Sequence, residues 1–397
     1  MLQVQIMDEA VEWRRVVFPD IIAGDSTWSR YSLVWSGIQA VAIVALESVI
    51  FRLHTIESHN IQVAITAALV VLQPKKNIVG PGEKEVIQTA RVLSVYHILF
   101  IIAQVFQLIL LCDAMFNKNT IQIMAIVLFN CAMVAYAGVQ VKQASDILVR
   151  TPGDSLPNAI LNLFELSPNP TPYHASLPYE IAVVSLMVFF ATGFAYIAYK
   201  LYKEFGWSIY KKIGADLAMR DMYKVYQIFI MILKFDIFFQ LGFSAQFLSV
   251  VVLQRDARAG EDRLSEEDMR SILIVHLILS TGASIILPFL AWFGLKRESK
   301  LSMTCFIAGG FATLVYNITK LNQVFGEPTR FIGANKFLCF FLIMNLLLGM
   351  ATIYLAWVCM KNFNNGLNAH IGKVAGTNIY PMESVSGPSA SKRWSIE

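Results

Sequence analysis

Long apolar runs recur along the 397 residues of this chain, with short polar segments between them. A helix needs about 20 such residues to cross a ~30 Å hydrocarbon core, where each backbone polar group must be bonded within the helix. Eight runs qualify: about 32–53, 91–115, 120–141, 179–202, 225–253, 271–295, 301–321 and 336–360. The sequence therefore predicts an all-α, polytopic transmembrane helix bundle of about eight spans.

Composition supports this fold class and leaves no room for a separate soluble domain. Hydrophobic residues make up 56% of the chain and charged residues only 15%, well outside the usual balance of a soluble domain. The run at 301–321 is the weakest span, because glycines and polar residues dilute it. A further apolar piece, 61–72, is too short to cross and is expected at the interface or under a loop. We predict a cytosolic segment 1–30, a bundle 31–361 and a largely disordered cytosolic tail 362–397.

Orientation is predicted from the basic residues that flank the spans, because cytoplasmic loops retain them. The segment after the fourth span is the most basic, with Lys200, Lys203, Lys211, Lys212, Arg220 and Lys224. Both termini are therefore expected in the cytosol. Acidic residues among the first 31 argue against a cleaved signal peptide, so the first span is expected to serve as a signal anchor.

The loop 203–222 has an amphipathic pattern. Ile209, Ile213 and Leu217 repeat every four residues, and Lys211 and Lys212 lie off that line. The pattern predicts an interfacial helix that also includes Trp207. Such a helix could bind anionic lipids of the cytosolic leaflet, or it could simply anchor the fourth and fifth spans at the headgroups.

The stretch MILKFDIFFQ places Lys234 and Asp236 inside the fifth span. Residues two apart point to different sides of a helix, so each charge needs its own partner. Asp236 begins a polar stripe with Gln240 and Ser244 at four-residue steps. The sixth span carries a matching stripe of His276, Ser280 and Ser284.

Two facing stripes predict a polar seam between the fifth and sixth spans, hidden from lipid. The other candidates for this seam are Glu47, His97, Gln104, Asn130 and Asn345, with Glu47 as the expected partner of Lys234. The ionisable groups could line a pathway and carry protons, or the seam could be a set of structural hydrogen bonds. A charged residue in mid-membrane costs about 2.5–3.5 kcal/mol, which favours function. His97, as a lone histidine, is expected to be structural.

Several classes of function lack their sequence signatures. The motifs HExxH and GxSxG, a P-loop and paired intramembrane aspartates are absent from the sequence. All five cysteines lie within or beside the spans, which is untypical of a disulfide framework or a metal site. A net charge of +4 with scattered basic residues gives no nucleic-acid face. We therefore expect no enzyme, no cofactor and no bound metal, and the lipid bilayer as the main partner.

Three stretches resemble a known family. They are KLYKEFGWSIYKKIGADLAMRDMYKVYQIFIMILKFDIFFQLGFSAQF at 200–247, CDAMFNKNTIQIMAIVLFN at 112–130, and KNFNNGLNAHI at 361–371. Together with the spacing of the spans, they are similar to an uncharacterised fungal family of multi-pass Golgi apparatus membrane proteins, over about residues 30–372. The resemblance implies a Golgi address and no mechanism.

Three functions stay open at this stage. The chain could have a trafficking or scaffold role, in which the 203–222 helix and the tail recruit partners. It could be a proton-coupled or ion-coupled transporter of small solutes that uses the seam between spans five and six. It could also be a receptor-like bundle of spans two to eight with an extra anchor. The internal repeat that marks many transporters is not visible in the sequence.

Overall fold

The computed structural model describes residues 26–72, 81–149, 172–213, 217–257, 266–326, 331 and 334–365, and these are almost entirely helical. The helices are α3 (Thr27–Leu72), α4 (Pro81–Asn117), α5 (Thr120–Val149), α7 (Pro172–Ile213), α8 (Leu217–Ala257), α9 (Glu266–His276), α10 (Ala283–Lys296), α11 (Lys300–Gly326) and α12 (Asn335–Lys361). A six-residue π-helix, η1 (Leu277–Gly282), joins α9 to α10, so the three form one continuous span.

Eight segments of these helices are long and apolar enough to cross a membrane, which confirms the predicted fold class. They are 27–56, 93–117, 120–142, 175–205, 218–252, 267–296, 300–326 and 335–361. The weakest predicted span is among them as α11. The short piece 61–72 continues α3 as helix to Leu72 beyond the spanning segment.

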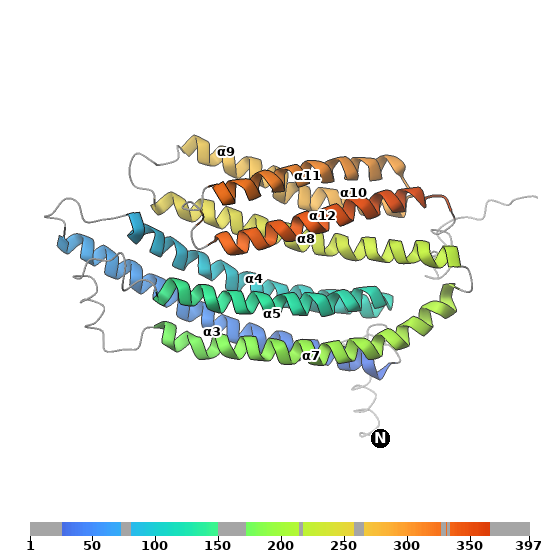
Figure 1. Cartoon of the computed structure of the whole chain (residues 1–397), viewed down its shortest axis with the longest axis horizontal. Helices are drawn as coiled ribbons and strands as arrows, with labels where there is room; N and C mark the ends of the chain where they lie inside the picture. Colours follow the sequence, from blue (N-terminus) through green and yellow to red (C-terminus); the bar gives the residue numbers. More distant parts are fainter. Residues whose placement is uncertain are drawn as a thin grey trace, which may run out of the picture.

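The eight spans form two rings of four helices, which lie one above the other in Figure 1. In the first ring, α3 packs against α4 and α7, and α5 packs against the same two helices. In the second ring, α8 and α11 each pack against α12 and α10. The rings meet where α8 contacts α4 and α5. Each ring follows the chain order around its circumference.

The distribution of side chains fits a lipid solvent. Large apolar side chains face outward, and Val41, Leu128 and Leu301 are 73%, 72% and 77% exposed. Glutamine, asparagine, histidine and glutamate side chains are instead buried inside the rings. Apolar residues can face lipid at no cost, whereas polar groups need partners there, so the polar groups gather inside.

Phenylalanine side chains fill the contact between the rings. Phe106 of α4 stacks on Phe238 of α8 with ring centroids 4.5 Å apart, and Phe129 of α5 meets Phe238 edge to face. At the same contact, Phe337 of α12 packs against Tyr96 of α4 with centroids 4.1 Å apart. Such aromatic pairs add about 0.5–1.5 kcal/mol each beyond their buried area. The contact is therefore apolar through its middle.

Short turns connect α4 to α5 and α10 to α11. The predicted hairpin between the second and third spans is present: Lys118 adopts a positive φ of 50°, and the Asn119 side chain accepts hydrogen bonds from the backbone N–H groups of Ile121 and Gln122. This cap starts α5 directly after α4. We call the membrane side of this turn, where α3 begins, the proximal face, and the opposite side, where the first span ends near Ile56, the distal face.

The segment 203–222, expected to form an interfacial helix, is not a separate element in the structure. The chain continues α7 as one helix to Ile213 and begins α8 at Leu217, so this segment consists of the ends of two long helices. Leucine and lysine are good helix formers, and residues 200–213 contain no proline. The one glycine of this stretch, Gly206, lies within α7 and does not end it. The side chains of Trp207, Ile209, Lys211, Lys212, Ile213 and Leu217 lie outside the described residues.

Candidate functional site

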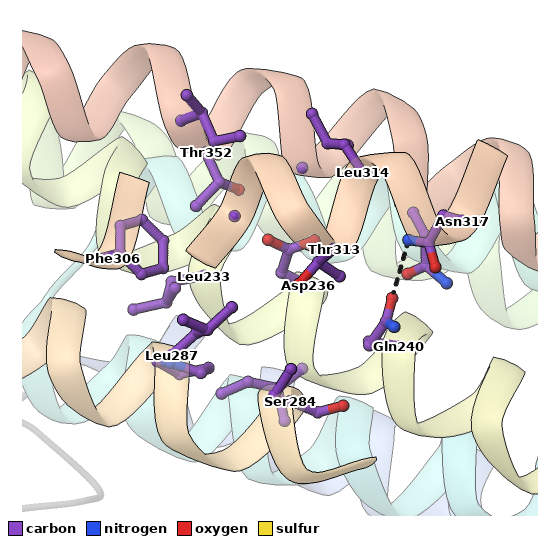
Figure 2. Close-up of a pocket in the computed structure, with 17 residues that line it drawn as sticks. Leu233, Asp236, Gln240, Ser284, Leu287, Phe306, Thr313, Leu314, Asn317 and Thr352 are labelled. Atoms are coloured by element: carbon purple, nitrogen blue, oxygen red, sulfur yellow. Dashed lines mark hydrogen bonds between the residues drawn. The ribbon is translucent and has the colours of Figure 1, made fainter. Parts of the chain in front are cut away.

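The second ring contains a partly open cavity of about 50 Å³ near the middle of its spans. Figure 2 shows Asp236 and Gln240 of α8 and Asn317 of α11 converging on it. The polar residues of the lining come from all four spans of the ring: Asp236, Gln240, Ser284, Thr313, Asn317, Asn345 and Thr352. Leu233, Ile237, Leu287, Phe306, Leu314 and Ile353 are among the apolar lining residues.

The amide N–H groups of this lining are engaged with other polar groups. Asn317 Nδ2 donates to Gln240 Oε1 at 3.2 Å, and Gln240 Nε2 donates to Ser280 Oγ at 3.1 Å. Asn345 Nδ2 donates to the backbone oxygen of Phe239 at 3.3 Å. These bonds tie α11, α8, η1 and α12 together and fix the orientation of each amide.

The oxygens of two of these amides do not take part in such bonds. Asn317 Oδ1 and Asn345 Oδ1 are buried and have no hydrogen-bond partner among the described residues. A buried amide oxygen without a partner costs about 1–3 kcal/mol. Two of them beside one cavity can accept hydrogen bonds from water or coordinate a cation.

The hydroxyl groups of the lining also present lone pairs. Ser284 donates its proton to the backbone oxygen of Ser280, and Thr313 donates to that of Gly309 at 3.0 Å. The Thr352 hydroxyl donates to the backbone oxygen of Leu348 at 2.7 Å. None of the lining residues is basic. The cavity is therefore rich in acceptors and poor in donors.

The structure brings the two predicted polar stripes together beside this cavity. Gln240 bonds Ser280, and Ser244 contacts both His276 Nε2 at 3.1 Å and the Thr281 hydroxyl. His276 Nδ1 contacts the Tyr316 hydroxyl. Sequence reasoning missed the contribution of α11, although the adjacent polar pair Tyr316-Asn317 inside a weak span was the available signal.

The helix that carries the second stripe is irregular at this point. The π-helical segment η1 ends at Gly282, and Pro288 lies inside α10 and lines the cavity. Both features interrupt the regular backbone ladder of a span. Irregular helix geometry in a membrane is found where it faces a cavity or a binding site.

The expected pairing of Lys234 with Glu47 is wrong. Lys234 Nζ contacts Asp113 Oδ2 and donates to Gln122 Oε1 at 3.1 Å. Asp113 and Gln122 flank the turn between α4 and α5, and α8 packs against both helices. This ion pair links the two rings near the proximal face. A side chain can pair only with residues of the helices that pack against its own helix. Because α8 packs against α4 and α5 and, within the described residues, not against α3, Lys234 meets Asp113 and not Glu47.

The first ring holds a second buried polar cluster. His97 Nδ1 lies 2.7 Å from Glu47 Oε2, and His97 Nε2 lies 2.9 Å from His54 Nδ1. His54 Nε2 lies 3.0 Å from Glu180 Oε1 and 3.1 Å from Ser176 Oγ. Glu47 and His97 therefore do not join the seam of the second ring, and His97 is not a lone histidine. His54 and Glu180 lie too close to the ends of their predicted spans to stand out in the sequence.

Buried amides continue this polar interior toward the proximal face. Gln39 Nε2 donates to Asn130 Oδ1 at 2.9 Å and to Gln104 Oε1 at 3.2 Å, and Gln107 joins the same group. Gln104 and Asn130 were expected in the seam between the fifth and sixth spans, and they lie in the first ring instead. The network joins α3, α4 and α5 in mid-membrane.

Comparison with known proteins finds a relative whose sequence is similar over most of this chain. The chain is 29% identical over 291 residues to a UPF0658 Golgi apparatus membrane protein of Schizosaccharomyces pombe, which covers 68% of this chain and 76% of that protein. No protein-family model matches the chain. No solved structure matches it. The similarity confirms the resemblance to an uncharacterised fungal family of multi-pass Golgi apparatus membrane proteins.

Proposed function

We propose that this chain is a multi-pass protein of the Golgi membrane that carries a small cation, a proton or a monovalent metal ion, through its second ring. The Golgi address rests on the name of the relative from Schizosaccharomyces pombe. The cation rests on the acceptor-rich cavity that Asp236 lines together with two unpartnered amide oxygens.

The charge of Asp236 is the first support for this function. A carboxylate in mid-membrane costs about 2.5–3.5 kcal/mol on insertion, and a typical interhelical hydrogen bond returns only about 0.6 kcal/mol. No Lys or Arg of the described residues forms an ion pair with Asp236. A bound cation would supply the balancing charge.

The chemistry and size of the cavity limit the kinds of ligand that it can hold. Carboxylate, amide and hydroxyl oxygens are the ligands that hard cations prefer. A cavity of about 50 Å³ holds a dehydrated ion with roughly one or two waters. Ligand sites for larger organic solutes typically enclose about 300–1,000 Å³. The site therefore suits an inorganic cation or a proton carried by water.

The two other functions have less support. The trafficking or scaffold role depends on side chains of 206–213 and on the tail, which lie outside the described residues. The receptor-like interpretation treats the first span as an extra anchor outside a bundle of seven. In the structure, α3 packs against α4 and α7 as a full member of the first ring.

Flux measurements in proteoliposomes test the proposal. The purified full chain is reconstituted, and proton, Na⁺ and K⁺ uptake are measured separately under an imposed membrane potential. We expect uptake of one of these cations well above that of empty liposomes, and a loss of at least about tenfold in Asp236→Asn, which conserves the shape of the side chain. A loss of one order of magnitude corresponds to about 1.4 kcal/mol.

Asp221→Asn is the matched control, because the same chemical change then falls on an exposed carboxylate paired with Lys224. This variant should transport as the wild type does. Uptake of all three cations at the level of empty liposomes, or full uptake by Asp236→Asn, would contradict the proposed function.

A further inference from the structure

The buried cluster of the first ring is an unbroken line of titratable groups. It runs from Glu47 through His97 and His54 to Glu180, with atom separations of 2.7, 2.9 and 3.0 Å. All four side chains are at most 2% exposed. They come from α3, α4 and α7, and neither the cavity of the second ring nor the contact between the rings includes them.

The geometry limits how many protons this line can hold. The 2.9 Å separation between His97 Nε2 and His54 Nδ1 has room for a single proton, because two N–H groups cannot face each other at that distance. The two imidazoles therefore cannot both be cations. One proton in each of the three links leaves the four groups with a net charge of −1 when both carboxyl groups hold no other proton.

A buried net charge is expensive, and described residues do not offset this one. Neither Glu47 nor Glu180 forms an ion pair with a lysine or arginine in the described part of the chain. One additional proton would make the cluster neutral. Glu180 Oε2, at the end of the line, is buried and has no hydrogen-bond partner among the residues that the structure describes.

One end of the line lies near the distal side of the membrane. His54 lies two residues before the end of the first span, and Glu180 lies about 7 Å along α7 from the start of the fourth. Both positions belong to the distal face. Beyond Glu47 the next buried polar groups toward the proximal face are the amides around Gln39, which do not accept and release protons as carboxyl and imidazole groups do.

We propose that Glu180, His54, His97 and Glu47 form a proton-binding chain that takes up one proton from the distal face through Glu180. The incoming proton binds the carboxyl of Glu180, and the protons of the three links shift by one position, so no other reactant is needed. The chain ends at Glu47, so it stores a proton and does not conduct it across the membrane.

The groups that neighbour the cluster on the adjacent helices are amides and hydroxyls. We therefore treat the four residues as the unit that takes up the proton. On α5, the Gln140 amide contacts both Glu47 and His97, and the Tyr136 hydroxyl donates to the backbone oxygen of Tyr96. On α7, the Ser176 hydroxyl donates to Glu180 Oε1 at 3.2 Å. The basic residues closest to the cluster along α3 and α5, Arg52 and Lys142, are exposed. The described residues contain no group of three or more ligands that could hold a metal ion, which favours a proton.

Nitrogen NMR of the histidine side chains tests this proposal in the full chain in lipid nanodiscs. The imidazole signals of His54 and His97 are assigned with His54→Gln and His97→Gln and then followed against pH. We expect both signals to change together with one shared midpoint. In Glu180→Gln we expect this shared transition to be lost for His97 as well, although His97 does not touch Glu180.

Two comparisons make the result specific. Glu204→Gln changes an exposed carboxylate of the same helix α7, bonded to Ser26, and should leave both signals unchanged. Glu180→Asp keeps a carboxyl group and should restore a shared transition. Separate midpoints for His54 and His97 in the wild type would overturn the proposal even if neither Glu180 variant folds. An unchanged His97 signal in folded Glu180→Gln, or Zn²⁺ bound by the wild type and lost in His97→Gln, would overturn it too.

Discussion

The ion pair between Lys234 and Asp113 gives the sharpest stability prediction, because it is a link between the two rings that the sequence did not indicate. The perturbations are Lys234→Met, Asp113→Asn and the double variant. The two side chains are 28% and 35% exposed, so the pair is neither fully buried nor at the surface.

The structure sets the expected magnitudes. Exposed ion pairs contribute about 0.2–1 kcal/mol, and removal of one partner from a buried pair costs about 3–5 kcal/mol. Asp113 keeps bonds from Gln122 at 2.7 Å and Asn117 at 3.0 Å when Lys234 is lost, so Lys234→Met should be milder. After discounting for solvent screening, we expect losses of about 1.5 kcal/mol for Lys234→Met and about 2.5 kcal/mol for Asp113→Asn.

The double variant should lose only about 2 kcal/mol, because neither charge is then left without its partner. The coupling free energy is therefore about 2 kcal/mol, within the range of residues in direct contact. Thermal unfolding in nanodiscs measures it, with about 2 °C of melting temperature for each kcal/mol in a chain of this size. Lys224→Met and Asp221→Asn form the matched control pair, since those side chains are 52% and 67% exposed and should change stability by less than about 1 kcal/mol.

Additive losses in the double variant would refute the direct pairing of Lys234 with Asp113. A coupling between Lys234→Met and Glu47→Gln, with none to Asp113→Asn, would instead support the pairing expected from the sequence. Either result would also question the packing of α8 against α4 and α5 that joins the rings.

Two further changes test the first ring by thermal unfolding. Gly193→Ala places a methyl group 2.1 Å from the ring of Trp35 and should cost about 1–3 kcal/mol, whereas Gly138→Ala, with open space around it, should be near neutral; equal melting temperatures would contradict this packing. Gln39→Leu removes the donor to Asn130 and leaves buried amide oxygens without partners, so we expect a loss of about 1–3 kcal/mol, and an unchanged melting temperature would refute the amide network.

The candidate site of the second ring could be predicted in part. Four-residue steps placed Gln240 and Ser244 on one side of α8, and His276, Ser280 and Ser284 on one side of the next span, and these stripes do face each other. Periodicity within a single helix is enough for such a prediction. The contributions of Asn317, Asn345 and Thr352 could not be found that way, because they depend on which later helices close the ring.

Assignment of Glu47, His97, Gln104 and Asn130 to the same seam failed for a related reason. Each was correctly expected to be buried and polar, since lipid would not tolerate it outside. The helices form two rings, however, and the sequence does not indicate in which ring a given polar residue lies. In both rings, spans that follow one another in the chain are neighbours, although the sequence shows no internal repeat.

Hydropathy by itself determined that this chain crosses a membrane about eight times with helices. A backbone N–H or C=O group without a hydrogen bond is costly in hydrocarbon, so each apolar segment must form a helix whatever the other segments do. Only the tertiary structure decided that these helices form two rings, that Lys234 meets Asp113, and that two histidines and two glutamates form one line. Partnership between helices depends on their rotation, tilt and neighbours, and those follow from contacts between residues far apart in the chain.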